Sequence, residues 1–256
     1  MRYLRLLFPV ILLFCGRGLS QDISAGQMLN SFVEDFKTDP AAADNPDLVF
    51  GIKVAGHGSR HVTINKHGRV SLHSGLPSAP TFFYTLSKES MRKLYEGEWS
   101  IITAMARANL SDPAPVNFGF MEGFSADSHF FGWFTRFSFH FWTRGFPEIV
   151  PFGKKEHTRV VHGADVAALY YQEGLRSAWY RIASGQHINE SPEDQKNPFP
   201  TLAIFISGQA QAKIGGEERT LQSGECVFIP AGISHEFWNN KEEAAEFIII
   251  MFGEGA

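Results

Sequence analysis

The stretch from Gly224 to Asn239 constrains this chain more than any other. It reads GECVFIPAGISHEFWN, so Gly224, Pro230, Gly232, His235 and Asn239 follow the spacing G-x5-P-x-G-x2-H-x3-N. A short apolar strand precedes Pro230, which ends strand pairing because it has no N–H to donate. Gly232 permits a turn that a side chain would obstruct. The spacing therefore predicts two strands joined by a tight turn, with His235 facing the space that they enclose.

This spacing resembles the second sequence motif of the cupin superfamily. Short apolar runs separated by turns surround it, and antiparallel strands at such spacing suit a jelly roll. The resemblance covers about residues 178–252 and implies an all-β cupin domain, a double-stranded β-helix, which we place at 157–256. The predicted strands are 166–172, 177–188, 201–206, 210–214, 226–229, 236–238 and 246–252.

The cupin resemblance also implies a place for a metal ion. The first cupin motif normally supplies two histidines as H-x-H and a glutamate, which hold the metal together with the later histidine. Here His187 and His235 retain histidine positions, whereas Asn189 and Thr201 stand at the other two and Glu193 lies nearby, out of register. A divalent transition metal needs at least three good ligands. We therefore expect an incomplete site, and the simpler interpretation makes His235 a barrel-lining residue and His187 a hairpin-end residue.

The chain from residue 21 to 125 combines strands with helices. Helical spacing of apolar residues predicts helices over 22–37, 88–96 and 100–110. Apolar runs with a period of two predict strands over 48–54, 61–64, 69–72 and 81–86. The pattern indicates an α+β domain.

Part of this α+β domain resembles the sterol carrier protein 2 lipid-transfer family. The resemblance rests on the turn Lys66–Val70, on Leu86–Glu89 and on Leu94–Trp99, and its best stretch is Thr85 to Trp99. It implies a sheet backed by helices around an apolar tunnel for acyl or sterol-like ligands. The alternative is that the same side chains fill a core without a ligand. The candidate tunnel residues are Met91, Leu94, Trp99, Ile102 and Met105.

Residues 126–156 form an aromatic-rich bridge. His129 to Phe146 reads HFFGWFTRFSFHFWTRGF, and its rings fit either one face of a helix or the alternation of a strand. The segment is interpreted as core shared by the two domains, with two alternatives: a lid over the tunnel, or a membrane-surface contact through 130–146. A proline-punctuated connector over 147–155 ends it.

The first twenty residues predict a secretory signal peptide rather than part of the fold. Arg2 and Arg5 precede an apolar stretch over 6–15, and small residues lead to a cleavage site near Ser20/Gln21. An uncleaved membrane anchor is the alternative. Cleavage removes one of two cysteines and leaves Cys226 alone, so no internal disulfide is expected. Asn109 begins a glycosylation sequon.

These patterns predict a secreted or extracytoplasmic binding protein for a hydrophobic small molecule, lipid or sterol-like, with an incomplete metal site in its cupin domain. The alternative is a metal-dependent cupin enzyme, an oxygenase, isomerase or lyase, that uses His187 and His235. A carbohydrate-binding or structural role rests only on analogy with other jelly rolls. The net charge of -4 argues against a nucleic-acid partner, and the cupin resemblance implies a homodimer through the cupin sheets.

Overall fold

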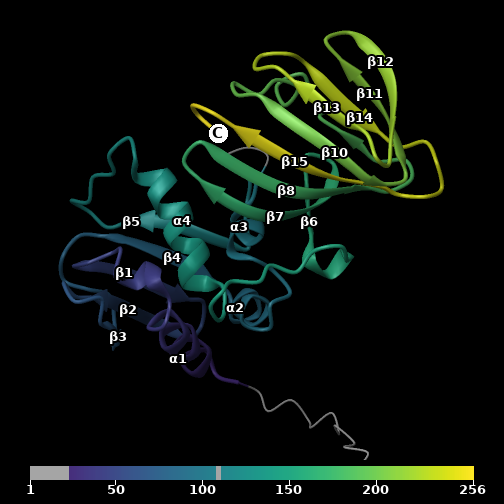
Figure 1. The fold of residues 1–256 in the computed structure, drawn as a ribbon. Helices are drawn as coiled ribbons and strands as arrows, with labels where there is room; N and C mark the ends of the chain where they lie inside the picture. The colour runs from purple at the N-terminus through teal and green to yellow at the C-terminus, as the bar shows by residue number, and fades with distance from the viewer. Residues whose placement is uncertain (1–22, 108–110) are drawn as a thin grey trace, which may run out of the picture.

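The computed structural model describes residues 23–107 and 111–256, which fold into two halves that pack against each other (Figure 1). The predicted signal peptide and the Asn109 sequon lie outside these residues. No helix within the described ranges combines the length and hydropathy needed to cross a membrane.

The first half is one five-stranded sheet covered by helices, with strand order β3-β2-β1-β4-β5. Strands β1 and β4 are parallel, and the other neighbours are antiparallel. The strands are β1 (Leu48–Val54), β2 (Gly58–Ile64), β3 (Val70–Ser74), β4 (Phe82–Leu86) and β5 (Val116–Phe120). The helices are α1 (Ala25–Phe36), the short 3-10 helix η1 (Pro40–Ala42), α2 (Lys88–Tyr95), α3 (Ile101–Met105) and α4 (Phe130–Trp142).

Most of these elements follow the sequence prediction, but α3 is shorter than the helix predicted over 100–110. Ser100 caps its start by accepting from the Thr103 N–H at 3.1 Å. Ala106 already has extended backbone angles, so the helix ends after Met105.

The aromatic bridge is the helix α4, and its rings complete the core of the first half. Phe134, Phe137 and Phe141 are buried and lie against the sheet. The ring of Phe141 packs edge-on against Phe50, with centroids 4.9 Å apart. The Tyr84 hydroxyl lies 2.6 Å from Ser138 Oγ, so this buried hydroxyl has a hydrogen-bond partner. The helical alternative is therefore the one adopted. Helix α4 packs on the sheet of the first half and also contacts the second half, where Phe139 meets Tyr170.

The second half is a sandwich of two antiparallel sheets, with strand orders β13-β10-β15-β8-β7-β6 and β12-β11-β14-β9. Buried residues alternate with outward-facing ones along β10 and β15, as a two-sheet core requires. The strands are β6 (Arg159–Val161), β7 (Ala164–Gln172), β8 (Leu175–Ile182), β9 (His187–Ile188), β10 (Thr201–Ser207), β11 (Gln209–Ile214), β12 (Glu217–Gln222), β13 (Cys226–Ile229), β14 (His235–Trp238) and β15 (Ala245–Phe252).

Two sequence predictions for the second half are wrong in detail. The strand predicted over 177–188 is divided, because Gly185 adopts φ 77° in a turn that carries the chain from one sheet to the other. The predicted strands also omit β12, which pairs with β11 from Gln209↔Gln222 to Ile214↔Glu217. Its side chains are mostly exposed, so an apolar pattern could not reveal it.

Helix α3 joins the two halves through buried hydrogen bonds to β7. The Ala168 N–H donates to Thr103 Oγ1 at 2.8 Å, and Ser100 Oγ donates to the Ala168 carbonyl at 2.9 Å. Arg159 Nη1 donates to the carbonyls of Thr103, Ala104 and Ala106 at 3.1, 3.1 and 2.6 Å, which satisfies the end of α3.

We expect Thr103→Val to destabilise the protein by about 1–3 kcal/mol, because it leaves the buried Ala168 N–H without its partner while keeping the side-chain volume. Urea unfolding followed by tryptophan fluorescence measures the change. Thr85→Val is the matched control, since Thr85 lies exposed on β4, and we expect a change within about 0.5 kcal/mol there. Superimposable unfolding curves for the two variants would show that this hydrogen bond contributes nothing to the free energy of unfolding.

Candidate functional site

The fixed positions around His235 each have a local structural task. Gly224 and Gly232 take φ 87° and 75°, the left-handed region that favours glycine. Asn239 is fully buried, and its Nδ2 donates to the carbonyls of Ile182 and Glu243 at 3.0 and 2.8 Å. The motif thus joins the end of β8 to the turn that follows β14.

The structure does not bring His187 and His235 together. In the register of β9 and β14, His187 lies opposite Trp238, and side chains alternate along β14. His235 therefore faces the core and is 4% exposed, whereas His187 lies on the outer face. There its Nε2 lies 3.2 Å from Glu236 Oε2 and its ring lies beside Trp238.

The other predicted ligand positions also do not converge on His235. Asn189 is buried with φ 58°, and its Nδ2 donates to the His235 carbonyl at 3.4 Å. Thr201 is buried, and its Oγ1 accepts from Asn197 at 3.2 Å. Glu193 is exposed. The side chains that the cupin resemblance assigns to metal binding therefore do not form a ligand set around His235.

The neighbour of His235 is a histidine from a different turn. His162 lies at the β6–β7 turn, where Gly163 allows the chain to approach the backbone of His187; a Cβ at Gly163 would lie 2.0 Å from that carbonyl. His162 Nδ1 is 3.8 Å from Asp194 Oδ1 and has no hydrogen-bond partner within the described residues. Burial lowers the pKa of His235, and the nearby His162 lowers it further, so neutral imidazole is favoured there.

The main apolar pocket of the described residues lies between the two halves and has a volume of about 570 Å³. Ile102, Met105 and Phe131 line it from α3 and α4, and Val166, Ala178 and Tyr180 line it from β7 and β8. These last three residues also belong to the core cluster of the barrel. The pocket therefore reaches from the junction of the halves to the inner face of the larger sheet.

Polar groups lie at both ends of the strands that line this pocket. His162 precedes β7, and Arg176 lies at the β7–β8 hairpin, opposite Tyr171. Arg176 Nη2 donates to Tyr171 Oη and to the Gly255 carbonyl at 3.4 and 3.2 Å, while its buried Nε has no partner within the described residues. Burial raises the pKa of Tyr180 to about 12, so its hydroxyl is a neutral donor. The pocket thus combines apolar walls with hydrogen-bond donors.

The predicted tunnel residues divide among three places. Ile102 and Met105 line the pocket between the halves. Leu94 and Trp99 line a separate pocket of about 160 Å³ next to Arg144. Met91 is fully buried in the core of the first half.

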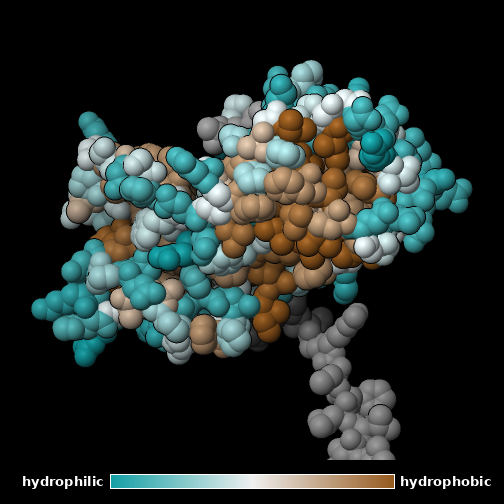
Figure 2. Space-filling view, turned by 45° about the horizontal axis from the view of Figure 1, so that its top comes forward, coloured by the Kyte–Doolittle hydropathy of each residue, from teal (hydrophilic) through white to brown (hydrophobic). Residues whose placement is uncertain are grey.

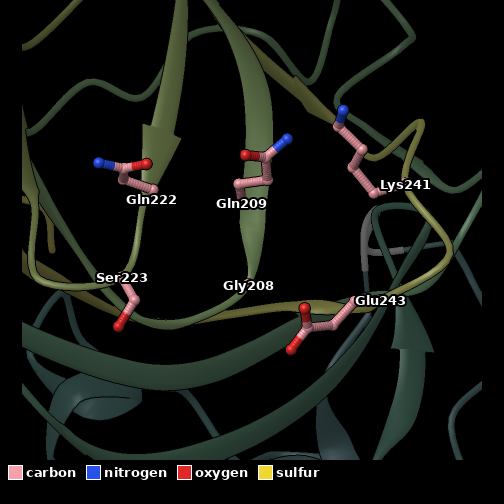
Figure 3. Close-up of a pocket in the computed structure, with 6 residues that line it drawn as sticks. All are labelled: Gly208, Gln209, Gln222, Ser223, Lys241 and Glu243. Carbon is pink, nitrogen blue, oxygen red and sulfur yellow. The ribbon is translucent and has the colours of Figure 1, made fainter.

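A third pocket, of about 470 Å³, lies at the end of the sandwich and is polar (Figure 3). Gln209, Gln222, Lys241 and Glu243 surround it on the β10–β11 turn, the end of β12 and the loop before β15. Such a lining does not suit a hydrophobic ligand.

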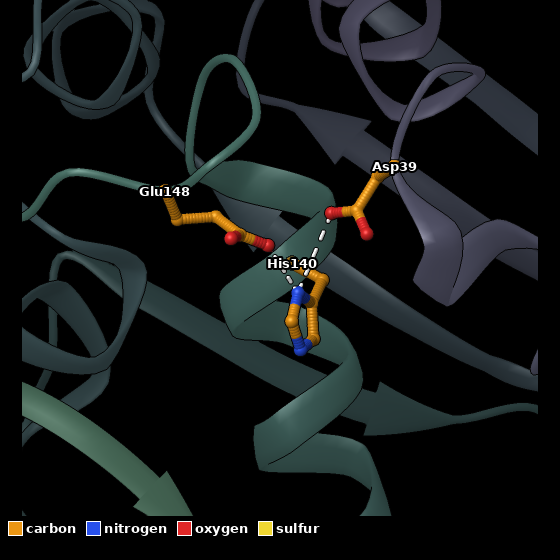
Figure 4. A group of neighbouring side chains, drawn as sticks. All are labelled: Asp39, His140 and Glu148. Carbon is orange, nitrogen blue, oxygen red and sulfur yellow. Dashed lines mark hydrogen bonds and ion pairs between the residues drawn. The ribbon is translucent and has the colours of Figure 1, made fainter.

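One group of three side chains in the described ranges could hold a metal ion, and it lies in the first half rather than in the barrel. Asp39, His140 and Glu148 each offer an atom, and these atoms lie within 4.8 Å of one another (Figure 4). Sequence reasoning missed this group because Asp39 precedes the other two members by about 100 residues and the three follow no spacing rule.

Comparison with known proteins bears on the second half only. Residues 181–251 match the family described as "Cupin domain". A Cupin 2 conserved barrel domain protein from Salinispora arenicola CNS-205 is 19% identical over 41% of this chain and 88% of its own, with a TM-score of 0.37. The plu4264 protein from Photorhabdus luminescens is 22% identical over the same shares, 41% and 88%, with a TM-score of 0.36. No curated protein matches the chain. The family match, together with the two-sheet sandwich and the motif around His235, identifies residues 181–251 as a cupin domain of type 2.

Proposed function

We propose that this protein binds an elongated hydrophobic molecule with an anionic end, and that the pocket between its two halves is the binding site. The observation that supports the proposal most is the pocket itself, whose volume of about 570 Å³ lies within the range of roughly 300–1,000 Å³ of small-molecule sites. Its walls are mainly apolar and carry polar groups such as Arg176 and Tyr180, as expected for a site that orients an amphipathic ligand.

The lining of the pocket favours an extended ligand. Along β7 it runs from Val166 to Tyr171, five residue steps that span roughly 17 Å at the rise of a β-strand. Each methylene buried there would contribute about 0.8 kcal/mol.

The guanidinium of Arg176 favours a carboxylate at one end of that ligand. Its unpartnered Nε is a buried donor, and a charged hydrogen bond to a ligand would satisfy it. The proposed ligand class is therefore a long-chain carboxylic acid or a related anionic lipid.

This proposal keeps the predicted hydrophobic cargo and changes its location. The resemblance to the sterol carrier family implies a tunnel within the first half, but the helix α4 fills the space over that sheet with aromatic rings. The adjoining side of α4 then lines the pocket through Phe131 and Thr135, together with Phe134. Secretion and a membrane-surface contact through 130–146 stay predictions.

The alternative prediction, a metal-dependent cupin enzyme, requires His187 and His235 at one centre. Because the two imidazoles face opposite sides of the sheet, that ligand set does not fit a metal ion. We therefore derive no reaction from it and retain ligand binding as the proposed function.

We expect Met105→Trp to weaken the binding of a fluorescent fatty acid at least about tenfold, because the larger ring occupies the pocket. Titration of the full mature chain measures the change, and mass spectrometry of an organic extract identifies any lipid that copurifies. Met121→Trp is the matched control outside the pocket. Equal affinities for both variants and the unmodified chain would place the ligand elsewhere.

The anionic end can be tested with a pair of ligands of equal chain length. We expect Arg176→Gln to reduce affinity for a long-chain fatty acid about tenfold and to leave affinity for the matching alcohol unchanged, because only the carboxylate gains a charged hydrogen bond. Arg136→Gln, on the exposed side of α4, is the control. A parallel loss for acid and alcohol would assign Arg176 a packing role instead.

The outer face of the larger sheet offers a surface for the predicted homodimer. Figure 2 shows apolar side chains gathered over the second half, and the register places Leu202 between Phe228 and Ile250. Phe228 is 54% exposed. We propose that a second copy of this chain covers this face.

We expect Phe228→Lys to shift the protein to monomer in analytical ultracentrifugation, because a charge replaces an exposed apolar contact beside Leu202 and Ile250. Val160→Lys is the control, since Val160 is also exposed but lies on β6, at the opposite edge of the sheet. A protein that sediments as a monomer before any substitution would contradict the dimer.

A further inference from the structure

Two distant parts of the chain meet at the group Asp39, His140 and Glu148: the segment after α1, and the end of α4 with the connector that follows it (Figure 4). Asp39 follows α1 and caps η1, where its Oδ1 accepts from the Ala41 N–H at 2.8 Å. His140 lies in the last turn of α4, and Glu148 lies at the start of the connector that follows. The cap fixes the carboxylate of Asp39 so that Oδ2 points at the imidazole.

The potential ligand atoms converge on one point. His140 Nδ1 lies 3.4 Å from Asp39 Oδ2 and contacts Glu148 Oε1. The side chains of Asp39, Glu148 and His140 are 4%, 9% and 23% exposed. The group is therefore shielded on most sides, with an opening on the side of the imidazole.

This group brings two buried carboxylates to one imidazole. They share one imidazole nitrogen, which can donate one proton only. Neither carboxylate forms an ion pair with a lysine or arginine among the described residues. Buried carboxylates of this kind are retained when they are paired or bind a metal.

We infer that Asp39 Oδ2, His140 Nδ1 and Glu148 Oε1 bind one divalent transition-metal ion. An imidazole nitrogen with two carboxylate oxygens suits Zn²⁺ and its neighbours, whereas Mg²⁺ and Ca²⁺ prefer oxygen ligands. Three protein ligands leave a fourth position for water on the open side.

The position of Glu148 gives this ion a structural task. The connector that begins there carries Phe152 onto Trp179 of β8, with ring centroids 6.2 Å apart. An ion held by Asp39 and His140 therefore fixes the start of the connector to η1 and α4. The inference is independent of the proposed lipid pocket, which shares none of the three ligands.

Zinc titration of the untagged, chelator-treated full chain tests this inference. We expect one equivalent of Zn²⁺ to bind and to raise the thermal unfolding temperature, since an ion that binds only the folded state stabilises it. His140→Gln and Glu148→Gln should each weaken binding about 100-fold or more, beyond the effect of an outer-shell change. The matched control is His129→Gln. His129 also belongs to the first half and pairs with a glutamate, Glu173, but both side chains are exposed.

His235→Gln distinguishes this site from one in the barrel. We expect it to bind Zn²⁺ as the unmodified chain does, and cobalt-loaded protein to lose its visible absorption only on substitution of Asp39, His140 or Glu148. Circular dichroism confirms that each variant is folded. Failure of the unmodified chain to bind Zn²⁺, equal binding by folded His140→Gln, or loss of binding in His235→Gln would each overturn the inference.

Discussion

The edge of β7 is the constraint on which the arrangement of this molecule depends. Strand β6 pairs with β7 only from Ala164 to Val166, so the polar backbone groups of Ala168 lie beyond the paired segment. An unpaired strand edge needs a partner, because buried N–H and C=O groups are costly without one. Ser100 and Thr103, which begin α3, supply that partner and thereby fix the first half against the barrel.

The pocket follows from this junction. Because α3 is only five residues long, it covers part of the inner face of β7 and β8 and leaves the rest to α4. The register shift between Ala168 and Tyr170 turns the later residues of β7 toward α4, where Tyr170 meets Phe139 with ring centroids 5.1 Å apart. The apolar pocket is the space between the α3–β7 hydrogen bonds and the contact of Phe139 with Tyr170. A ligand there would contact both halves at once.

The sequence could predict the elements better than it could predict their meeting points. The motif around His235 indicated the cupin domain because its glycines, proline and asparagine each serve a local turn. Turns of this kind can be predicted from the residue types and their spacing. The prediction that His187 and His235 lie at one centre is wrong because of a turn outside the motif. The turn at Gly185 shifts the chain into the second sheet, and β9 keeps only two residues there, with His187 opposite the outward-facing Trp238. A change of one residue in register exchanges the two faces of a strand.

The same limit explains what the sequence missed in the first half. The pocket and the Asp39 group both depend on α4, whose two stripes point in different directions. Phe134, Phe137 and Phe141 pack on the sheet. Phe131 and Thr135 line the pocket together with Phe134, and Phe139 contacts Tyr170 of β7. Both stripes are aromatic or small, so composition could not separate a core-facing side from a ligand-facing side. The helix α4 therefore contributes to the core, forms a wall of the pocket and, through His140, contacts the connector. A change in its position would alter all three together.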